Sequence, residues 1–445
     1  MTLETKHARV DVHDALGRHL LVDGLPLVFD LEASHGSWAV DRRSGDRFLD
    51  FFTFFASLPL GFNHEVFTKA EVREKLLDAA VHKPSNSDAY TEAYASFVSS
   101  FSEIALPSEF KHLFFIEGGA LAVENAIKVA FDWKVNKNIA AGVGNSETPI
   151  GSRVLHFQEA FHGRSGYTLS LTNTDPVKTD YFPKFDWPRV PNPKRRFPAD
   201  QNEIERIETS EAKCLEAMEA AFQHHPNDIA AILLEPVQGE GGDNHFRPEF
   251  FVKLREIADR EEALLIFDEV QTGFGLTGKF WAYENFNVTP DIVAFGKKAQ
   301  VCGIMVTDRI DEISDNVFEK SSRINSTWGG NLVDMVRCET ILNTIDDENL
   351  VTHAAEMGQQ LIAELQTLAG DFPEHVSNVR GLGLMCAFDL PSDVAVGKFV
   401  QEALDRRVLI LPCGERSVRF RPALTTTRED LDFGMAQVRS VLSNL

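Results

Sequence analysis

The fold of this chain is decided by Ile266-Phe-Asp-Glu-Val-Gln-Thr-Gly273 and, after a spacer, Asp291-Ile-Val-Ala-Phe-Gly-Lys-Lys298. Two apolar runs here, Ala263–Phe267 and Ile292–Phe295, have the length and composition of buried parallel strands. An aspartate follows the first run directly, and a lysine follows the second after one glycine. Open α/β sheets gather their ligands at the carboxyl ends of their strands. We therefore expect this acid and this amine to meet at one edge of a sheet.

An acid and an amine presented together suit pyridoxal 5'-phosphate. Its aldehyde reacts with a lysine amine, and its ring nitrogen pairs with a carboxylate. The sequence thus predicts a pyridoxal phosphate site built on Asp268 and Lys297. The next residue, Lys298, is an alternative amine that the sequence alone does not exclude.

The remaining pattern indicates an α/β chain of two unequal domains. Short apolar runs alternate with helical patterns from about residue 75 to 335, which is typical of a parallel sheet built from βαβ units. We expect an N-terminal segment at 1–75, a large domain at 76–335 and a small domain at 336–445. The other strands are expected at Ser37–Asp50 (two strands and a turn), Leu113–Ile116, Val154–Phe157, Ile229–Leu234, Gly383–Leu390, Val408–Pro412 and Val418–Arg421. Asn192–Ala212 is expected to be a surface connection leading to a helix near Lys213–Phe222, and Thr426 and Glu429 to cap the last helix.

Composition excludes several classes of protein. The 445 residues carry a net charge of −23, which disfavours binding to nucleic acid or to anionic membranes. No stretch of about 18 apolar residues occurs, and Met1–Asp23 lacks the apolar core of a signal peptide. The five cysteines are scattered without CxxC spacing, so we expect a reduced cytoplasmic protein with neither disulfides nor a metal site.

A phosphate site is predicted at Glu117-Gly-Gly-Ala120, between a strand and a helix. Apolar residues at Val123, Ala126, Ile127 and Ala130 have helical spacing. Small residues at such a junction leave backbone N–H groups free at the positive end of the helix dipole. A tight turn without a ligand is the alternative, and the nearby acid and amine favour the phosphate.

Three further clusters combine polar residues with strand ends or strand alternation. Phe161-His-Gly-Arg164 could stack on a flat cofactor and clamp a carboxylate, or could be a core aromatic beside a solvated arginine. Glu235-Pro-Val-Gln-Gly-Glu-Gly-Gly242 could be a loop that approaches a ligand, or a surface turn. Val418-Arg-Phe-Arg-Pro422 places two arginines on one face of a strand, where solvated edge residues are the default expectation.

A nicotinamide site is disfavoured, although Gly273-Phe-Gly-Leu-Thr-Gly278 matches GxGxxG. The motif does not begin at the strand end, and the segment after it is too short and interrupted for a crossover helix.

Taken together, these clusters resemble the fold-type I, class III aminotransferases, in that family's order and over nearly the whole chain. Within the family they are most similar to the bacterial L-lysine 6-aminotransferases. That similarity rests on Phe161-His-Gly-Arg-Ser-Gly-Tyr-Thr-Leu-Ser-Leu-Thr-Asn-Thr174, Phe185-Asp-Trp-Pro188, Phe295-Gly-Lys-Lys-Ala-Gln-Val-Cys-Gly303 and Asn325-Ser-Thr-Trp-Gly-Gly-Asn331. The resemblance implies a large domain with a mixed, mostly parallel sheet flanked by helices. It also implies a smaller α+β domain formed by the C-terminal part with the N-terminal segment, and a homodimer whose active sites are shared across the interface.

The resemblance also implies a role for each site residue. Lys297 would bind the cofactor covalently and act as catalytic base, and Asp268 would keep the pyridine nitrogen protonated. The other cofactor-binding residues would be Gly119, Ala120, Phe161, Glu235, Gln271 and, from the neighbouring subunit, Thr327. The substrate-binding residues would be Arg164, Glu240, Asn325 and Arg419. Many relatives have Ser-Gly-Ser/Thr-Glu where this chain has Glu117-Gly-Gly-Ala120, so its phosphate site would depend on backbone N–H groups.

The implied reaction moves the ε-amino group of L-lysine to 2-oxoglutarate. Glu240 would neutralise Arg419 while lysine is bound and move away when Arg419 pairs with the keto acid's α-carboxylate. Another class III enzyme acting on ornithine, 4-aminobutyrate or acetylornithine is the nearest alternative. A mutase or racemase would keep Lys297 but need no second carboxylate clamp, and a binding protein without cofactor would need neither Lys297 nor Asp268.

Overall fold

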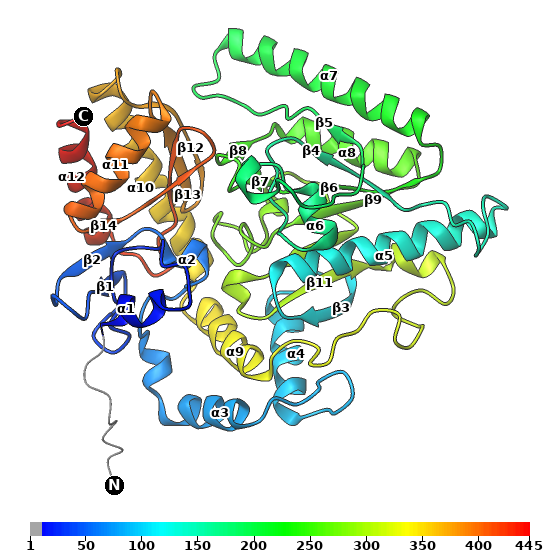
Figure 1. Ribbon diagram of the computed structural model, residues 1–445, viewed down its shortest axis with the longest axis horizontal. Helices are drawn as coiled ribbons and strands as arrows, with labels where there is room; N and C mark the ends of the chain where they lie inside the picture. Colours follow the sequence, from blue (N-terminus) through cyan, green and yellow to red (C-terminus); the bar gives the residue numbers. More distant parts are fainter. Residues whose placement is uncertain (1–10) are drawn as a thin grey trace.

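The computed structural model describes residues 11–445, so the first ten residues of the predicted 1–75 segment and of Met1–Asp23 lie outside it. Its centre is a seven-stranded mixed sheet in the order β3-β11-β10-β9-β6-β4-β5 (Figure 1). The strands are β3 (Phe110–Ile116), β4 (Arg153–Phe157), β5 (Arg189–Val190), β6 (Ile229–Leu234), β9 (Leu264–Asp268), β10 (Ile292–Phe295) and β11 (Cys302–Thr307). β10, β9, β6, β4 and β5 are parallel, and β11 runs antiparallel between β10 and β3. The predicted α/β class and mostly parallel sheet are confirmed.

Alternation of side chains along the strands builds a core on each face of the sheet. In β9, Leu265 and Phe267 join one cluster, whereas Leu264 and Ile266 join the other. The first cluster packs under α4 (Glu92–Ile104), α7 (Gln201–His224), α8 (Pro248–Arg260) and α9 (Leu332–Asp347). The second packs under α5 (Gly119–Ala140). Both faces of the sheet are therefore buried, which explains why the strand sequences are unbroken apolar runs.

A second sheet and three helices form the C-terminal part, at the left of Figure 1. Its antiparallel order is β12-β13-β16-β15. The elements are β12 (Ser377–Leu382), β13 (Met385–Asp389), β15 (Leu411–Cys413), β16 (Ser417–Phe420), α10 (Leu350–Asp371), α11 (Asp393–Asp405) and α12 (Arg428–Leu442). The N-terminal strands β1 (Trp38–Val40) and β2 (Arg47–Asp50) lie beside this part, because β2 pairs in parallel with β14 (Val408–Leu409).

The remaining elements are short or connect these parts. They are α1 (Val12–Gly17), α2 (Thr53–Ala56), α3 (Ala70–Val81), α6 (Gly166–Leu171), the hairpin β7 (Val237–Gln238) and β8 (Asn244–His245), and the 3-10 turns η1 (Glu65–Thr68), η2 (Pro176–Lys178), η3 (Ala282–Asn285), η4 (Lys297–Ala299) and η5 (Asp308–Glu312). Within residues 11–445, no helix is long and apolar enough to span a membrane.

Three local expectations are wrong. The helix expected near Lys213–Phe222 begins at Gln201, because Asp200 caps it by accepting from the backbone N–H of Glu203 at 2.8 Å. The capping box of the last helix is formed by Thr427 and Asp430, one residue later than expected. Val408–Pro412, expected as one strand, is divided between β14, which pairs with β2, and β15, which pairs with β16.

Burial lowers the pKa of His245 to about 3, so this histidine is neutral in the fold. An unfolded histidine has a pKa near 6.5 and binds a proton below that pH. The contribution of His245 to stability is therefore complete above about pH 6.5 and is lost as the pH falls toward 3. At pH 5.5 the loss is about 1.4 kcal/mol. His245→Gln should flatten the fall in melting temperature between pH 7.5 and 5.5. The same change at exposed His82 is the control, and an unchanged slope in His245→Gln would contradict this account.

Candidate active site

The predicted acid and amine meet at one edge of the central sheet. Asp268 ends β9 and lies opposite Ala294 of β10 in the parallel register. Gly296 and Lys297 follow two and three residues later, so the lysine lies just beyond the same edge. Burial, together with the positive charges of Arg419 and Arg421, lowers the pKa of Lys297 to about 8, although the negative charge of Asp268 opposes this shift. The lysine amine is thereby closer to its neutral, nucleophilic form near physiological pH.

A buried histidine orients the aspartate, and sequence reasoning assigned it no role. His162 Nδ1 lies 2.8 Å from Asp268 Oδ2, and both side chains are almost completely buried. The other carboxylate oxygen accepts from the backbone N–H of Val270 at 3.1 Å. His162 is in turn held by its backbone N–H, which donates to Thr172 Oγ1 at 2.9 Å. The only sequence signal for this contact was its place between Phe161 and Arg164.

Lys298 is bound to the backbone. Its Nζ donates to the carbonyl of Gln271 at 2.6 Å and to that of Ala56 at 3.4 Å. Burial lowers its pKa well below the ordinary value, and nearby Lys297 adds to this shift. Among the described residues, Lys297 Nζ has no such bond to a backbone carbonyl, in contrast to Lys298.

The start of α5 lies where the sequence predicts a phosphate site. Gly118 precedes the helix with φ of +97°, and among the described residues no side chain caps it. A Cβ on Gly119 would lie 2.9 Å from a methyl group of Val270, and one on Gly163 would collide with Ala120. The helix start is therefore packed against the loop after β9 and the loop after β4. Its free N–H groups and dipole suit an anion.

Three predicted cofactor residues, Phe161, Glu235 and Gln271, are held by hydrogen bonds near this edge. Glu235 accepts from the backbone N–H groups of Phe161 at 2.9 Å and Gly239 at 3.0 Å. Burial, together with the negative charge of Asp268, raises the pKa of Glu235 to about 8. Gln271 Oε1 accepts from Arg421 at 3.0 and 3.1 Å, which leaves its amide NH2 as a donor.

The two arginines of the last sheet are buried and paired, so the default expectation of solvated edge residues is wrong. Arg419 Nη2 lies 2.9 Å from Glu240 Oε2, and Arg421 forms a fully buried ion pair with Asp243. Both acids come from the turn between β7 and β8. Arg419 Nη1 is buried without a hydrogen-bond partner among the described residues. This donor can bind a carboxylate that enters the site.

A lysine that sequence analysis did not single out completes the charge cluster. Lys178 Nζ donates to Glu240 Oε1 at 2.6 Å and lies 5.6 Å from the centre of the Phe161 ring. Burial alone would raise the pKa of Glu240, but Arg419 and Lys178 hold it below its ordinary value. Glu240 is therefore an anion bound by two cations.

A turn with left-handed backbone conformation places an aromatic ring beside Arg419. Thr53, Phe54, Phe55 and Ala56 all have φ between +42° and +63°. The Phe55 ring centre lies 5.6 Å from the Arg419 guanidinium carbon. Each such residue costs about 1–2 kcal/mol, so the surrounding contacts must hold the turn in place.

Three predicted site residues are not brought into this cluster. Arg164, Asn325 and Thr327 are exposed on the surface of the single chain. Trp328 beside them is 41% exposed and contacts Lys83, whose Nζ lies 3.8 Å from its ring centre.

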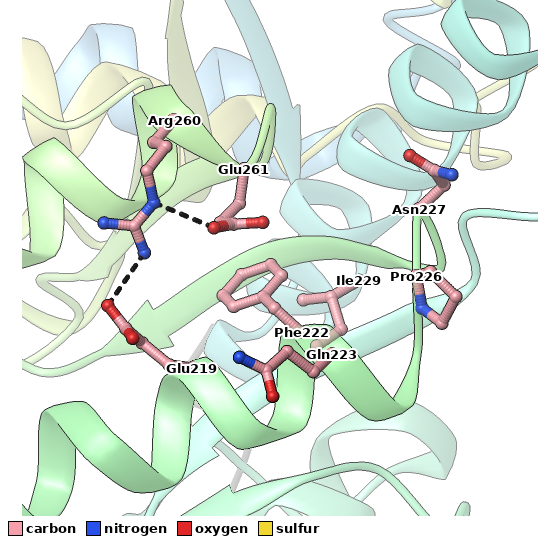
Figure 2. A pocket seen from close by; sticks show the side chains of 8 residues that line it. All are labelled: Glu219, Phe222, Gln223, Pro226, Asn227, Ile229, Arg260 and Glu261. Carbon is pink, nitrogen blue, oxygen red and sulfur yellow. Dashed lines mark hydrogen bonds and ion pairs between the residues drawn. The ribbon is translucent and has the colours of Figure 1, made fainter.

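The cavity in Figure 2 is unrelated to these residues. It has a volume of about 330 Å³ and is lined by residues of α7, α8 and the start of β6, including Phe222, Ile229 and Arg260. Ile229 begins β6, whereas Glu235 follows its carboxyl end. The cavity thus lies at the opposite edge of the sheet from Asp268 and Lys297.

Comparison with known proteins identifies the family. The family Aminotransferase class-III matches residues 22–442. The chain belongs to the class-III aminotransferases. It is 52% identical to the L-lysine-epsilon aminotransferase of Mycobacterium tuberculosis, over 97% of this chain and 95% of that protein. It is 49% identical to the L-lysine-epsilon aminotransferase of Amycolatopsis lactamdurans over the full length of both. The structure of lysine aminotransferase from M. tuberculosis superposes with a TM-score of 0.95, over 97% of this chain and 98% of that chain.

Class-III aminotransferases are fold-type I enzymes that depend on pyridoxal 5'-phosphate, and this edge of the sheet fits that group. Asp268 provides a buried carboxylate, Lys297 an amine of lowered pKa, and α5 an uncapped helix start.

The lowered pKa of Lys297 predicts how the cofactor-free protein takes up its cofactor. Only the neutral amine attacks the aldehyde, so the rate of covalent attachment should rise about tenfold between pH 7 and 9 and level off above the pKa. Stopped-flow absorbance after mixing with pyridoxal phosphate measures this rate. Lys297→Ala is the control and should show no attachment. A rate that still rises steeply at pH 10, or attachment in Lys297→Ala, would contradict the assignment.

Proposed function

We propose that this chain is an L-lysine 6-aminotransferase. It moves the ε-amino group of L-lysine to 2-oxoglutarate, giving L-glutamate and 2-aminoadipate 6-semialdehyde, which cyclises to piperideine-6-carboxylate. The ion pair between Arg419 and Glu240 carries this proposal. It gives the site an arginine whose charge is either neutralised by Glu240 or free to bind a substrate carboxylate. The names of the two relatives about 50% identical to this chain support the same substrate.

Residues of this chain divide the chemistry between them. When bound, pyridoxal phosphate supplies an aldehyde that takes up the amino group and a ring that takes up electrons from the reacting carbon. Asp268, oriented by His162, would pair with the ring nitrogen and keep it protonated. Phe161 would pack on the ring, and the N–H groups of Gly119 and Ala120 would bind the phosphate.

Lys297 moves the proton. With pyridoxal phosphate bound, Nζ would take up the proton from the ε-carbon of lysine as general base and return it later in the same half-reaction. A general base in this position contributes about 10²–10⁴-fold to the rate. Its lowered pKa keeps a useful fraction of the amine neutral near pH 7 to 8.

The two substrates place different groups beside Arg419. Lysine reacting through its ε-amine has only methylene groups there, and Glu240 stays on Arg419 so that its charge is not left unpaired. The α-carboxylate of lysine is held far from the chemistry by Arg164 and Asn325. The α-carboxylate of 2-oxoglutarate takes Arg419 directly, and Glu240 moves away.

The active unit is a homodimer in this proposal. Asn325 and Thr327 are exposed on one protomer, which suits residues that complete the site of a partner. Thr327 would then bind the cofactor phosphate across the interface.

We further propose that the chain divides near residues 75 and 335 into the three predicted segments. We also propose that the protein lies in a reducing cytoplasm, which the five free, buried cysteines support.

A coupled assay tests the substrate. L-lysine and 2-oxoglutarate should yield glutamate together with a cyclic imine that forms a yellow adduct with 2-aminobenzaldehyde. Ornithine, 4-aminobutyrate and acetylornithine are run in parallel. Turnover with lysine should exceed turnover with these donors. Glutamate formed from another donor but not from lysine would retain the aminotransferase and refute the substrate.

Substitution of Glu240 tests the switch. Glu240→Gln leaves Arg419 without a counter-charge when lysine is bound, so kcat/KM for lysine should fall about tenfold, or about 1.4 kcal/mol. The reaction of α-amino donors such as glutamate should fall much less, since their α-carboxylate neutralises Arg419. Glu159→Gln is the matched control, because Glu159 pairs with Lys194 and not with Arg419. Equal losses for lysine and glutamate in Glu240→Gln would refute the switch.

A further inference from the structure

The carboxylate of Glu240 is shared between two cations from different parts of the chain. Oε2 binds Arg419 Nη2 of β16 at 2.9 Å, and Oε1 accepts from Lys178 Nζ of η2 at 2.6 Å. The side chains of Glu240 and Lys178 are 25% and 26% exposed, and that of Arg419 is 4% exposed. Their pairing is therefore only partly screened by water, unlike that of a surface salt bridge.

The local structure directs Lys178 inward. Asp175 caps η2 by accepting from the backbone N–H of Val177 at 3.0 Å. Val177 then points to solvent and is 84% exposed, whereas the next residue, Lys178, reaches Glu240 and lies over the Phe161 ring. Further along the same connection, Lys184 Nζ donates to the carbonyl of Thr179 at 3.0 Å. Lys178 thus bonds this connection to the site, whereas Lys184 bonds to a residue within the connection.

The sharing of Glu240 between Arg419 and Lys178 affects how 2-oxoglutarate binds, and this step rests on the proposed function. When 2-oxoglutarate binds Arg419, Glu240 loses one of its two cations. A partly buried carboxylate without any counter-charge is costly, which would hold Glu240 on Arg419 and oppose binding of the keto acid. Lys178 remains as a partner because it binds the other carboxylate oxygen and comes from an element outside β16.

We propose that Lys178 is a positioning residue that retains Glu240 when Arg419 is taken by 2-oxoglutarate, and that it thereby sets the affinity for the keto acid. The lysine half of the reaction depends on it less, because Glu240 keeps Arg419 as its partner there.

Kinetics of Lys178→Met test the proposal. The KM for 2-oxoglutarate should rise about fivefold, while kcat/KM for lysine stays within about twofold of wild type. Lys178→Arg should restore most of the affinity, because it keeps the cation. Lys184→Met is the matched control, since this lysine lies in the same connection without contacting Glu240, and it should leave both constants unchanged. A normal KM for 2-oxoglutarate in Lys178→Met would overturn the proposal.

A double variant separates positioning from simple attraction of a dianion. If Lys178 acts through Glu240, adding Lys178→Met to Glu240→Gln should not change the KM for 2-oxoglutarate further. A fivefold rise in that background too would overturn the proposal and make Lys178 a direct contact. Calorimetric binding of glutarate, an unreactive dicarboxylate, to the holoenzymes should follow the same pattern without turnover. If wild type forms no glutamate from lysine, the proposed function fails by itself. If wild type is active and Lys178→Met matches it, only this inference fails.

Discussion

The site depends first on the parallel pairing of β9 and β10. Because Asp268 lies opposite Ala294 in this register, the lysine three residues beyond Ala294 must emerge at the same edge as the acid. Both strands are buried on both faces, so a slip of one residue would turn apolar side chains of either core to the wrong side. The hydrophobic pattern that builds the sheet therefore also fixes the distance between carboxylate and amine.

A second constraint joins the large sheet to the C-terminal part. Arg419 lies in β16 and Arg421 directly follows that strand, and they pair with Glu240 and Asp243 of the turn between β7 and β8. The pair between Arg421 and Asp243 is fully buried, and breaking such a pair costs about 3–5 kcal/mol. That pair is a fixed anchor. The pair between Arg419 and Glu240 is partly exposed, and the buried Nη1 of Arg419 has no partner among residues 11–445. Two adjacent ion pairs thus differ in how readily they can open.

Sequence reasoning succeeded where chemistry follows local pattern. The strands Ile229–Leu234 and Ile292–Phe295 have the predicted bounds, and Asp268, Glu235 and Lys297 lie at strand ends as expected. It missed contacts between residues far apart in the chain, such as that of His162 with Asp268 and that of Lys178 with Glu240. The spacing of these residues along the sequence does not predict the contacts, because tertiary packing alone brings the partners together.

The left-handed turn at Thr53–Ala56 was also beyond prediction, because Phe54, Phe55 and Thr53 all disfavour positive φ. The strain is held by Asp50, which accepts from the backbone N–H groups of Phe52 and Thr53 at 2.8 Å, and by Thr53 Oγ1, which donates to the carbonyl of Arg421 at 2.6 Å. The turn is thereby bonded to Arg421, which directly follows the strand that carries Arg419. Arg421 with its buried ion pair, Arg419 with an ion pair that can open, and the Phe55 ring beside Arg419 therefore lie close together. A site that accepts two substrates of different charge needs this combination, because only the carboxylate between the cations has to move.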